Sequence, residues 1–229
     1  MSTITLIATG HKENGLCNSQ ELFKIIEQIS PDVIFEEIPP GKFEAVYEGT
    51  RQASLEVKTI KAYLQKYPDT HHYPVDLDIE QATEKEIKKE VDGIYFICKD
   101  YSPEYNYLDS LIPYWTEKYG FPFLNNDRCS EILSRKKALE KQILNTLRKD
   151  KNQRAMNHER LELAYKHWID QIDDRENEML RNIYSYMEQK KYDRALFLVG
   201  AAHRKPMQQK IEEYESKESF KLNWTFYNN

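Results

Sequence analysis

The chain has 229 residues, a formal net charge of −5 at pH 7 and a charged fraction of 31%. This length suffices for one α/β domain with a sizeable core, and the many charges with only 7 glycines favour a helix-rich fold. The acidic balance argues against nucleic acid as a partner. Three widely spaced cysteines indicate no disulfide framework. Neither a basic leader nor a long apolar segment is present, so we expect a cytoplasmic protein without a membrane partner.

The beginning of the chain predicts a strand, a helix and a second strand. Strand-forming residues occupy positions 4–8, and a helix begins at about Ser19, where Asn18 is a suitable N-cap. The second strand covers residues 33 to 36 or 37. A unit of about 35 residues in this order is typical of a right-handed parallel crossover.

The middle of the chain is predicted to be mostly helical. Helical spacing of apolar residues resumes over residues 42–66, and residues 71–76 form a short third strand that ends in an acid. Residues 80–190 then form a helical insertion or layer. Its helices are expected to break near residues 102–103, 120–122 and 150–152.

The end of the chain returns to strand patterns. Residues 195–199 are continuously apolar, and residues 220–226 alternate apolar with polar side chains, as in a half-buried edge strand. We therefore predict a single α/β domain over residues 1–229, with a mixed, mainly parallel central sheet flanked by helices. The helical insertion lies in the middle of this domain.

Two histidines follow apolar strands near opposite ends of the chain. His11 ends the segment Ala8-Thr9-Gly10-His11, and His203 ends Gly200-Ala201-Ala202-His203. Parallel strands place their C-terminal ends on one edge of a sheet, where open α/β folds bind ligands. We therefore expect the two histidines to meet there. The loop after the first strand lacks the Lys and Ser/Thr of a phosphate loop, which excludes that type of nucleotide site.

Charged residues lie close to these strand ends. Glu36 and Glu37 end the second strand, and because successive strand residues alternate faces, only one of them is expected to face the site. Arg175 falls on the apolar stripe of a helix, and a buried guanidinium needs an anionic partner. Glu36, Glu37, Asp76 or an anionic substrate would serve. Alternatively, Arg175 lies at the edge of the stripe and reaches water.

Together, these residues resemble the superfamily of TraB-like proteins, Tiki metalloproteases, ChaN-like proteins and erythromycin esterases. That family has two GxxH motifs, an acid ending the second strand and an Arg-acid-x-x-Met helix. The matching segments, in family order, are Ala8 to His11, Glu36 or Glu37, Asp76, Arg175 to Met179 and Gly200 to His203. The first segment has Ala in place of the first Gly, and the helical middle carries no motif.

The resemblance implies a hydrolase that cleaves an amide or ester bond of a small-molecule or peptide substrate. The candidate catalytic residues are His11, Glu36, Glu37, Arg175 and His203, and the candidate substrate-binding residues are Glu13, Asp76 and Glu176. In a metal-bound version, His11, Glu37 and His203 hold a manganese, iron or zinc ion whose bound water attacks. In a metal-free version, a histidine removes the proton from water.

Two other classes of function stay open. Because the family includes haem-linked members, a non-catalytic protein that binds haem or an anionic metabolite in the same pocket is the main alternative. The other is an interaction protein whose helical middle docks a partner.

Overall fold

The computed structural model describes residues 2–49, 53–149, 158–217 and 219–228. The chain divides into two compact units. The first, here called the sheet unit, comprises Met1–Asp78, Tyr114–Ser130 and Arg175–Asn229. The second, the helical unit, comprises Ile79–Pro113 and Glu131–Asp174. The predicted helical region 80–190 thus contains the helical unit except Ile79, while its residues 114–130 and 175–190 belong to the sheet unit.

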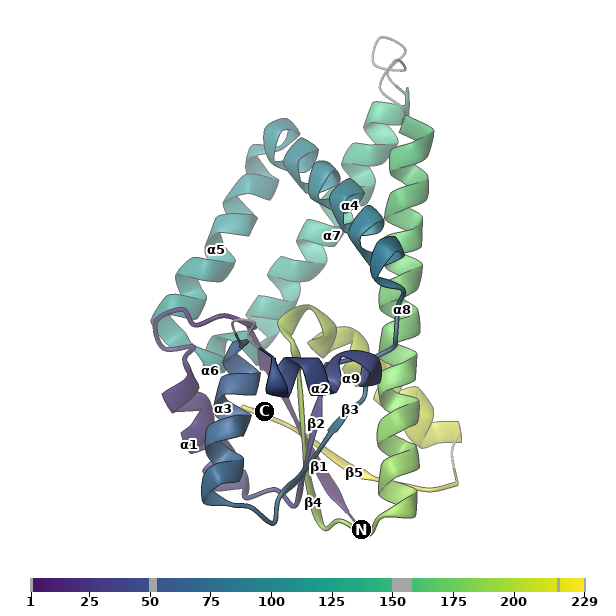
Figure 1. The fold of residues 1–229 in the computed structure, drawn as a ribbon. Coiled ribbons are helices and arrows are strands. Elements are labelled where there is room, and N and C mark those ends of the chain that lie inside the picture. The colour runs from purple at the N-terminus through teal and green to yellow at the C-terminus, as the bar shows by residue number, and fades with distance from the viewer. Residues whose placement is uncertain (1, 50–52, 150–157, 218, 229) are drawn as a thin grey trace. The chain divides into compact units, whose positions relative to one another are not determined.

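The sheet unit is built on five strands in the order β3-β2-β4-β1-β5 (Figure 1). Each neighbouring pair is parallel, so the described sheet is parallel throughout rather than mixed. The α/β class and the flanking helices are as predicted. The strands are β1 (Thr3–Thr9), β2 (Val33–Glu36), β3 (His71–Pro74), β4 (Arg194–Gly200) and β5 (Asn223–Phe226).

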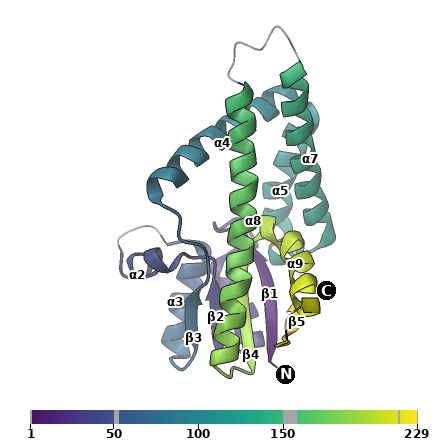
Figure 2. The ribbon, with the colours of Figure 1, turned by 90° about the vertical axis from the view of Figure 1, so that its right-hand side faces the viewer.

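Helices cover both faces of this sheet (Figures 1 and 2). On one side lie α1 (Ser19–Ile29) and α3 (Leu55–Lys66). On the other lie α9 (Arg204–Lys217) and the C-terminal part of α8 (His158–Gln189). The second side carries a large apolar core. This core includes Leu6, Phe35, Met179, Ile183, Phe197 and Met207, all fully buried.

Side-chain caps mark the starts of α1 and α3. Asn18 accepts hydrogen bonds from the first turn of α1, as predicted. The predicted helix over residues 42–66 is two helices, α2 (Pro40–Glu48) and α3. Gly49 is the C-cap of α2, and the Ser54 side chain caps α3. Sequence periodicity missed this break because both segments have helical spacing.

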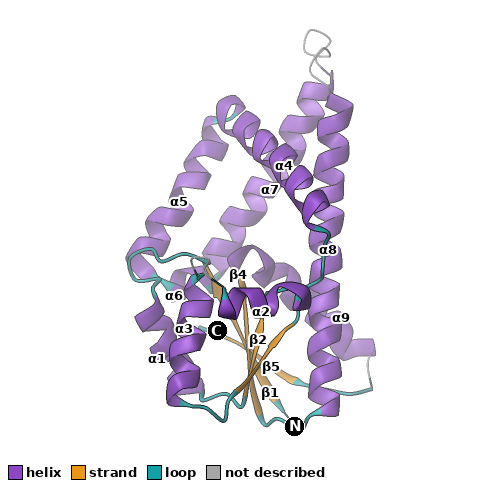
Figure 3. Ribbon diagram, in the orientation of Figure 1, coloured by secondary structure: helices purple, strands orange, loops and turns teal. Residues whose placement is uncertain are grey.

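The helical unit contains helices joined by loops and no strand among its described residues (Figure 3). The predicted breaks near residues 102–103 and 120–122 are confirmed by the helix bounds, and the one at 150–152 lies outside the described residues. No described helix is both long and apolar enough to cross a membrane. The remaining elements of the chain are α4 (Gln81–Tyr101), α5 (Pro103–Tyr119), α6 (Phe121–Leu124), α7 (Asp127–Lys149) and the 3-10 helix η1 (Ala201–His203).

Candidate functional site

Parallel pairing of β1 with β4 brings the two histidine motifs together. The register pairs Thr9 with Gly200, so both strands end at the same level of the sheet. His11 follows two residues after β1 with a positive φ of 57°. His203 ends the 3-10 helix that follows β4. The expectation that the two motifs share one sheet edge is confirmed.

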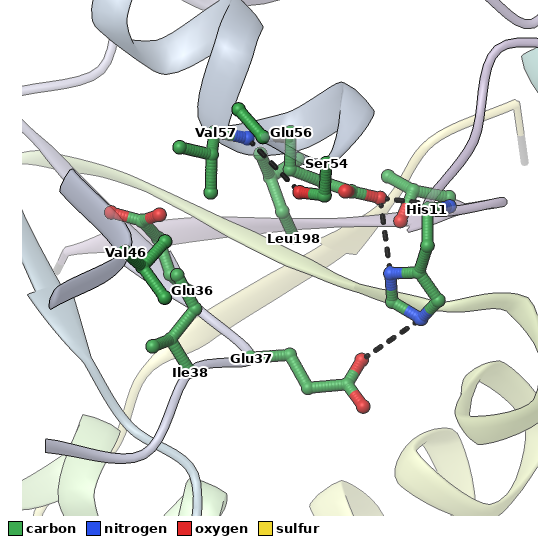
Figure 4. Close-up of a pocket in the computed structure, with 11 residues that line it drawn as sticks. His11, Glu36, Glu37, Ile38, Val46, Ser54, Glu56, Val57 and Leu198 are labelled. Carbon is green, nitrogen blue, oxygen red and sulfur yellow. Dashed lines mark hydrogen bonds and ion pairs between the residues drawn. The ribbon is translucent and has the colours of Figure 1, made fainter. Parts of the chain in front are cut away.

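The carboxylate of Glu37 lies at this edge of the sheet, between the two histidines. One oxygen, Oε1, lies 3.4 Å from Nε2 of His203 and accepts a 2.7 Å hydrogen bond from Arg175. The other, Oε2, lies 3.8 Å from Nε2 of His11 and accepts a 2.7 Å hydrogen bond from the Gly200 amide. Figure 4 shows Glu37 and His11 facing each other. The Glu37 side chain is 8% exposed, so this anion is buried among donors.

Each histidine also has a carboxylate of its own on the opposite ring nitrogen. Nδ1 of His203 lies 2.8 Å from Glu176. Nδ1 of His11 lies 3.3 Å from Glu56, which also accepts a 3.1 Å hydrogen bond from the His11 backbone amide (Figure 4). A carboxylate on Nδ1 sets the ring orientation and tautomer. Both rings therefore turn Nε2 towards Glu37.

Arg175 holds the acids of the site in place. Its Nε and one terminal nitrogen donate to the two oxygens of Asp76 at 2.9 and 2.7 Å, and that terminal nitrogen also reaches Glu37. Its side chain is 20% exposed, so of the two sequence interpretations the one with an anionic partner is confirmed. The fork geometry of a guanidinium suits this bridging of two carboxylates.

Charge in the site shifts the titration of its groups. Burial lowers the pKa of His203, but the hydrogen bonds to Glu176 and Glu37 outweigh burial and raise it to about 9. The hydrogen bond to Glu56 raises the pKa of His11 above its ordinary value of 6.5. Burial raises the pKa of Glu37, but His203, His11 and Arg175 together hold it well below its usual range. The buried carboxylate is therefore charged at neutral pH.

Of the two adjacent acids, Glu37 faces the histidines and Glu36 does not. The side chain of Glu36 accepts a 2.6 Å hydrogen bond from the Tyr47 hydroxyl and lies 2.8 Å from Nδ1 of His72. Burial raises its pKa, against the effect of these two partners. Successive side chains at the end of β2 alternate in direction, so the two acids point to different places. The sequence predicted that only one of them faces the site, and that residue is Glu37.

The three predicted substrate-binding acids lie in different surroundings. Asp76 is held by Arg175, and Glu176 by His203. Glu13 lies on the surface, where it accepts hydrogen bonds from the Ser19 hydroxyl at 2.6 Å and from Lys58 at 3.1 Å. Asp76 and Glu176 therefore belong to the site through their contacts with Arg175 and His203. Glu13 lies apart from them, beside the start of α1.

Two contributors were missed by the sequence analysis. Glu56 resembles an ordinary acid in the first turn of a helix, because its contact with His11 depends on how α3 meets the β1 loop. Gly200 was named as the first residue of the second GxxH motif, but its close packing against the site was not predicted. A Cβ at this position would lie 2.6 Å from Nε2 of His11 and 3.3 Å from Glu37, so a side chain here would displace the ring.

The predicted metal donors are a poor fit for an ion. Both Glu37 oxygens already accept hydrogen bonds, and the Arg175 guanidinium places a positive charge against the same carboxylate. Within the described part of the chain, no group of three or more His, Cys, Asp or Glu side chains is arranged to hold a metal. We therefore derive no catalytic step through a metal, and the metal site stays a prediction.

Comparison of the chain with family models, curated proteins and solved structures gives no significant match. The family resemblance therefore rests on the motif residues themselves.

The close approach at Gly200 leads to a prediction. We expect Gly200→Ala to displace the His11 ring and move its imidazole signals in ¹H–¹⁵N NMR spectra, because the added methyl group overlaps Nε2. The matched control is Gly93→Ala, where a Cβ meets nothing within 4 Å. Unchanged His11 signals in both variants would show that Gly200 does not set the position of the ring.

Proposed function

We propose that this protein hydrolyses an ester or amide bond without a metal, with His11 as general base and His203 as a positively charged partner. One observation carries the proposal: two imidazoles turn Nε2 towards Glu37 while each has a second carboxylate on Nδ1. A histidine that contacts one carboxylate through Nδ1 and faces a second charged group through Nε2 is a typical arrangement for acid–base catalysis.

His11 is suited to remove a proton from water. Its side chain is 51% exposed, whereas that of His203 is 9% exposed. Nε2 of His11 lies 3.8 Å from Glu37, beyond hydrogen-bond distance, which leaves this nitrogen available to a water proton. Glu56 on Nδ1 stabilises the imidazolium that forms.

The proposed reaction uses one water molecule. The water oxygen forms a bond to the substrate carbonyl carbon while its proton passes to Nε2 of His11. The carbonyl oxygen becomes an oxyanion, and the charge of protonated His203 favours it. When the tetrahedral intermediate collapses, the bond to the leaving oxygen or nitrogen breaks and His11 returns the proton to it. The products are a carboxylic acid and an alcohol or amine.

Glu37, Arg175 and Asp76 are positioning residues in this proposal. Glu37 is a weak base because its pKa is lowered, and its oxygens already accept hydrogen bonds. Its role is to keep His11 and His203 close to each other and to favour their protonated forms. Arg175 and Asp76 fix Glu37 in turn.

The first test replaces each histidine and measures hydrolysis of p-nitrophenyl esters. We expect His11→Ala and His203→Ala each to lower kcat/KM by roughly 10²–10⁴-fold, the usual contribution of a positioned acid or base. His167→Ala, at an exposed helix position, is the matched control and should leave the rate unchanged. Unchanged hydrolysis in both site variants would sink the assignment.

Three additional measurements separate the alternatives. Metal analysis and rates in EDTA test the metal-bound version, which predicts a bound ion and loss of activity. An absorbance spectrum tests haem binding, which predicts a strong band in the haem region. The metal-free hydrolase predicts full activity in EDTA and no such band.

The dependence of the rate on pH tests the roles of the two rings. His11 must be neutral to accept a proton, and its raised pKa puts the acid limb of the kcat/KM profile above pH 6.5. His203 must be protonated, so the alkaline limb falls near pH 9. In Glu56→Gln the main cause of the raised His11 pKa is lost, and the acid limb should move to lower pH. An acid limb that does not move would contradict the base assignment.

A further inference from the structure

A cavity of about 280 Å³ opens beside His11. It lies between the ends of β1 and β2, the helix α2 and the start of α3 (Figure 4). His11, Glu37 and Glu56 line it, so the cavity is continuous with the candidate site. Its position is where the part of a substrate next to the reacting carbonyl would lie.

The remainder of the wall is largely aliphatic. Ile38, Val46, Val57 and Leu198 line the cavity and come from four different segments of the chain (Figure 4). Val57 and Leu198 are buried, and Val46 is half-buried. Such a surface gains free energy when it covers an apolar chain, by about 0.8 kcal/mol for each methylene removed from water.

The charge of the lining works against an anionic ligand. Three acidic residues, Glu36, Glu37 and Glu56, are among those that line the cavity, whereas no Lys or Arg lines it in the described part of the chain. The nearby cations of the site are already engaged, Arg175 by Asp76 and Glu37 and the protonated His203 by Glu37 and Glu176. A carboxylate or phosphate inside this cavity would lose hydration and meet like charge.

From the cavity we propose that the substrate is an ester or amide with a neutral, aliphatic acyl chain, whose chain lies against Val46 and Val57. A water molecule occupies about 30 Å³ in the liquid, so the cavity holds a group of roughly nine non-hydrogen atoms. A hexanoyl group fits this volume. That the bound group is an acyl chain rests on the proposed function.

The first experiment measures kcat/KM for p-nitrophenyl acetate, butyrate, hexanoate and hemisuccinate, after subtraction of the rate of His11→Ala. We expect the rate to rise by roughly 80- to 250-fold from acetate to hexanoate, since each of the four added methylenes contributes roughly threefold to fourfold when buried. The hemisuccinate, which has a free carboxylate, should react at least about tenfold more slowly than the butyrate, because the acidic lining opposes it.

Two variants on α2 test whether the preference for hexanoate over acetate arises in the cavity. Val46→Phe fills the cavity and should abolish the preference for hexanoate over acetate. Ala45→Phe adds the same ring at the neighbouring, exposed position and should keep the preference. His11-dependent hydrolysis that is indifferent to chain length, or that prefers the hemisuccinate, would overturn the inference and leave the proposed function standing.

A binding experiment tests the cavity when no ester is hydrolysed. Hexanamide should shift the methyl NMR signals of Val46 and Val57, also in His11→Ala, and hexanoate should bind at least about tenfold more weakly. Hexanamide binding without any hydrolysis would refute the proposed function but support a cavity for neutral aliphatic chains. Equal binding of hexanoate, or no shift of these methyl groups, would overturn the inference.

Discussion

The buried carboxylate of Glu37 is the interaction on which the rest of the site depends. A charged group in a nearly closed environment is costly unless donors surround it. Here the donors are Arg175 from α8, the Gly200 amide from the end of β4 and the ring of His203. Removal of one partner from a buried pair of charges typically lowers the free energy of unfolding by about 3–5 kcal/mol. The contacts with Glu37 therefore constrain α8, the end of β4 and the segment with His203 to lie close together.

The fold and the meeting of the two histidines could be predicted because they follow from local rules. The apolar segments of β1 and β4 predict parallel strands, and parallel strands end on the same edge. The need of Arg175 for an anion follows from the cost of burying a lone charge, and the structure supplies both Asp76 and Glu37. These predictions required no knowledge of which strands are neighbours.

The remaining features depend on distances between segments that no spacing in the chain encodes. The choice between Glu36 and Glu37 depends on the residue at which β2 ends, and Glu56 reaches His11 only because α3 begins beside the β1 loop. Glu13 is close to His11 in sequence, yet its hydrogen bonds to Ser19 and Lys58 keep it at the surface. The aliphatic side chains of the cavity come from four segments and belong to no motif.

The role of Glu37 is tested most directly by the pKa of His203, measured by NMR in Glu37→Gln and in Glu36→Gln. Glu37 lies 3.4 Å from the ring and helps to raise its pKa to about 9, whereas Glu36 is bound to Tyr47 and His72. We expect Glu37→Gln to move the pKa of His203 towards 6.5 and Glu36→Gln to leave it unchanged. An unchanged pKa in Glu37→Gln would contradict the claim that this carboxylate organises the site.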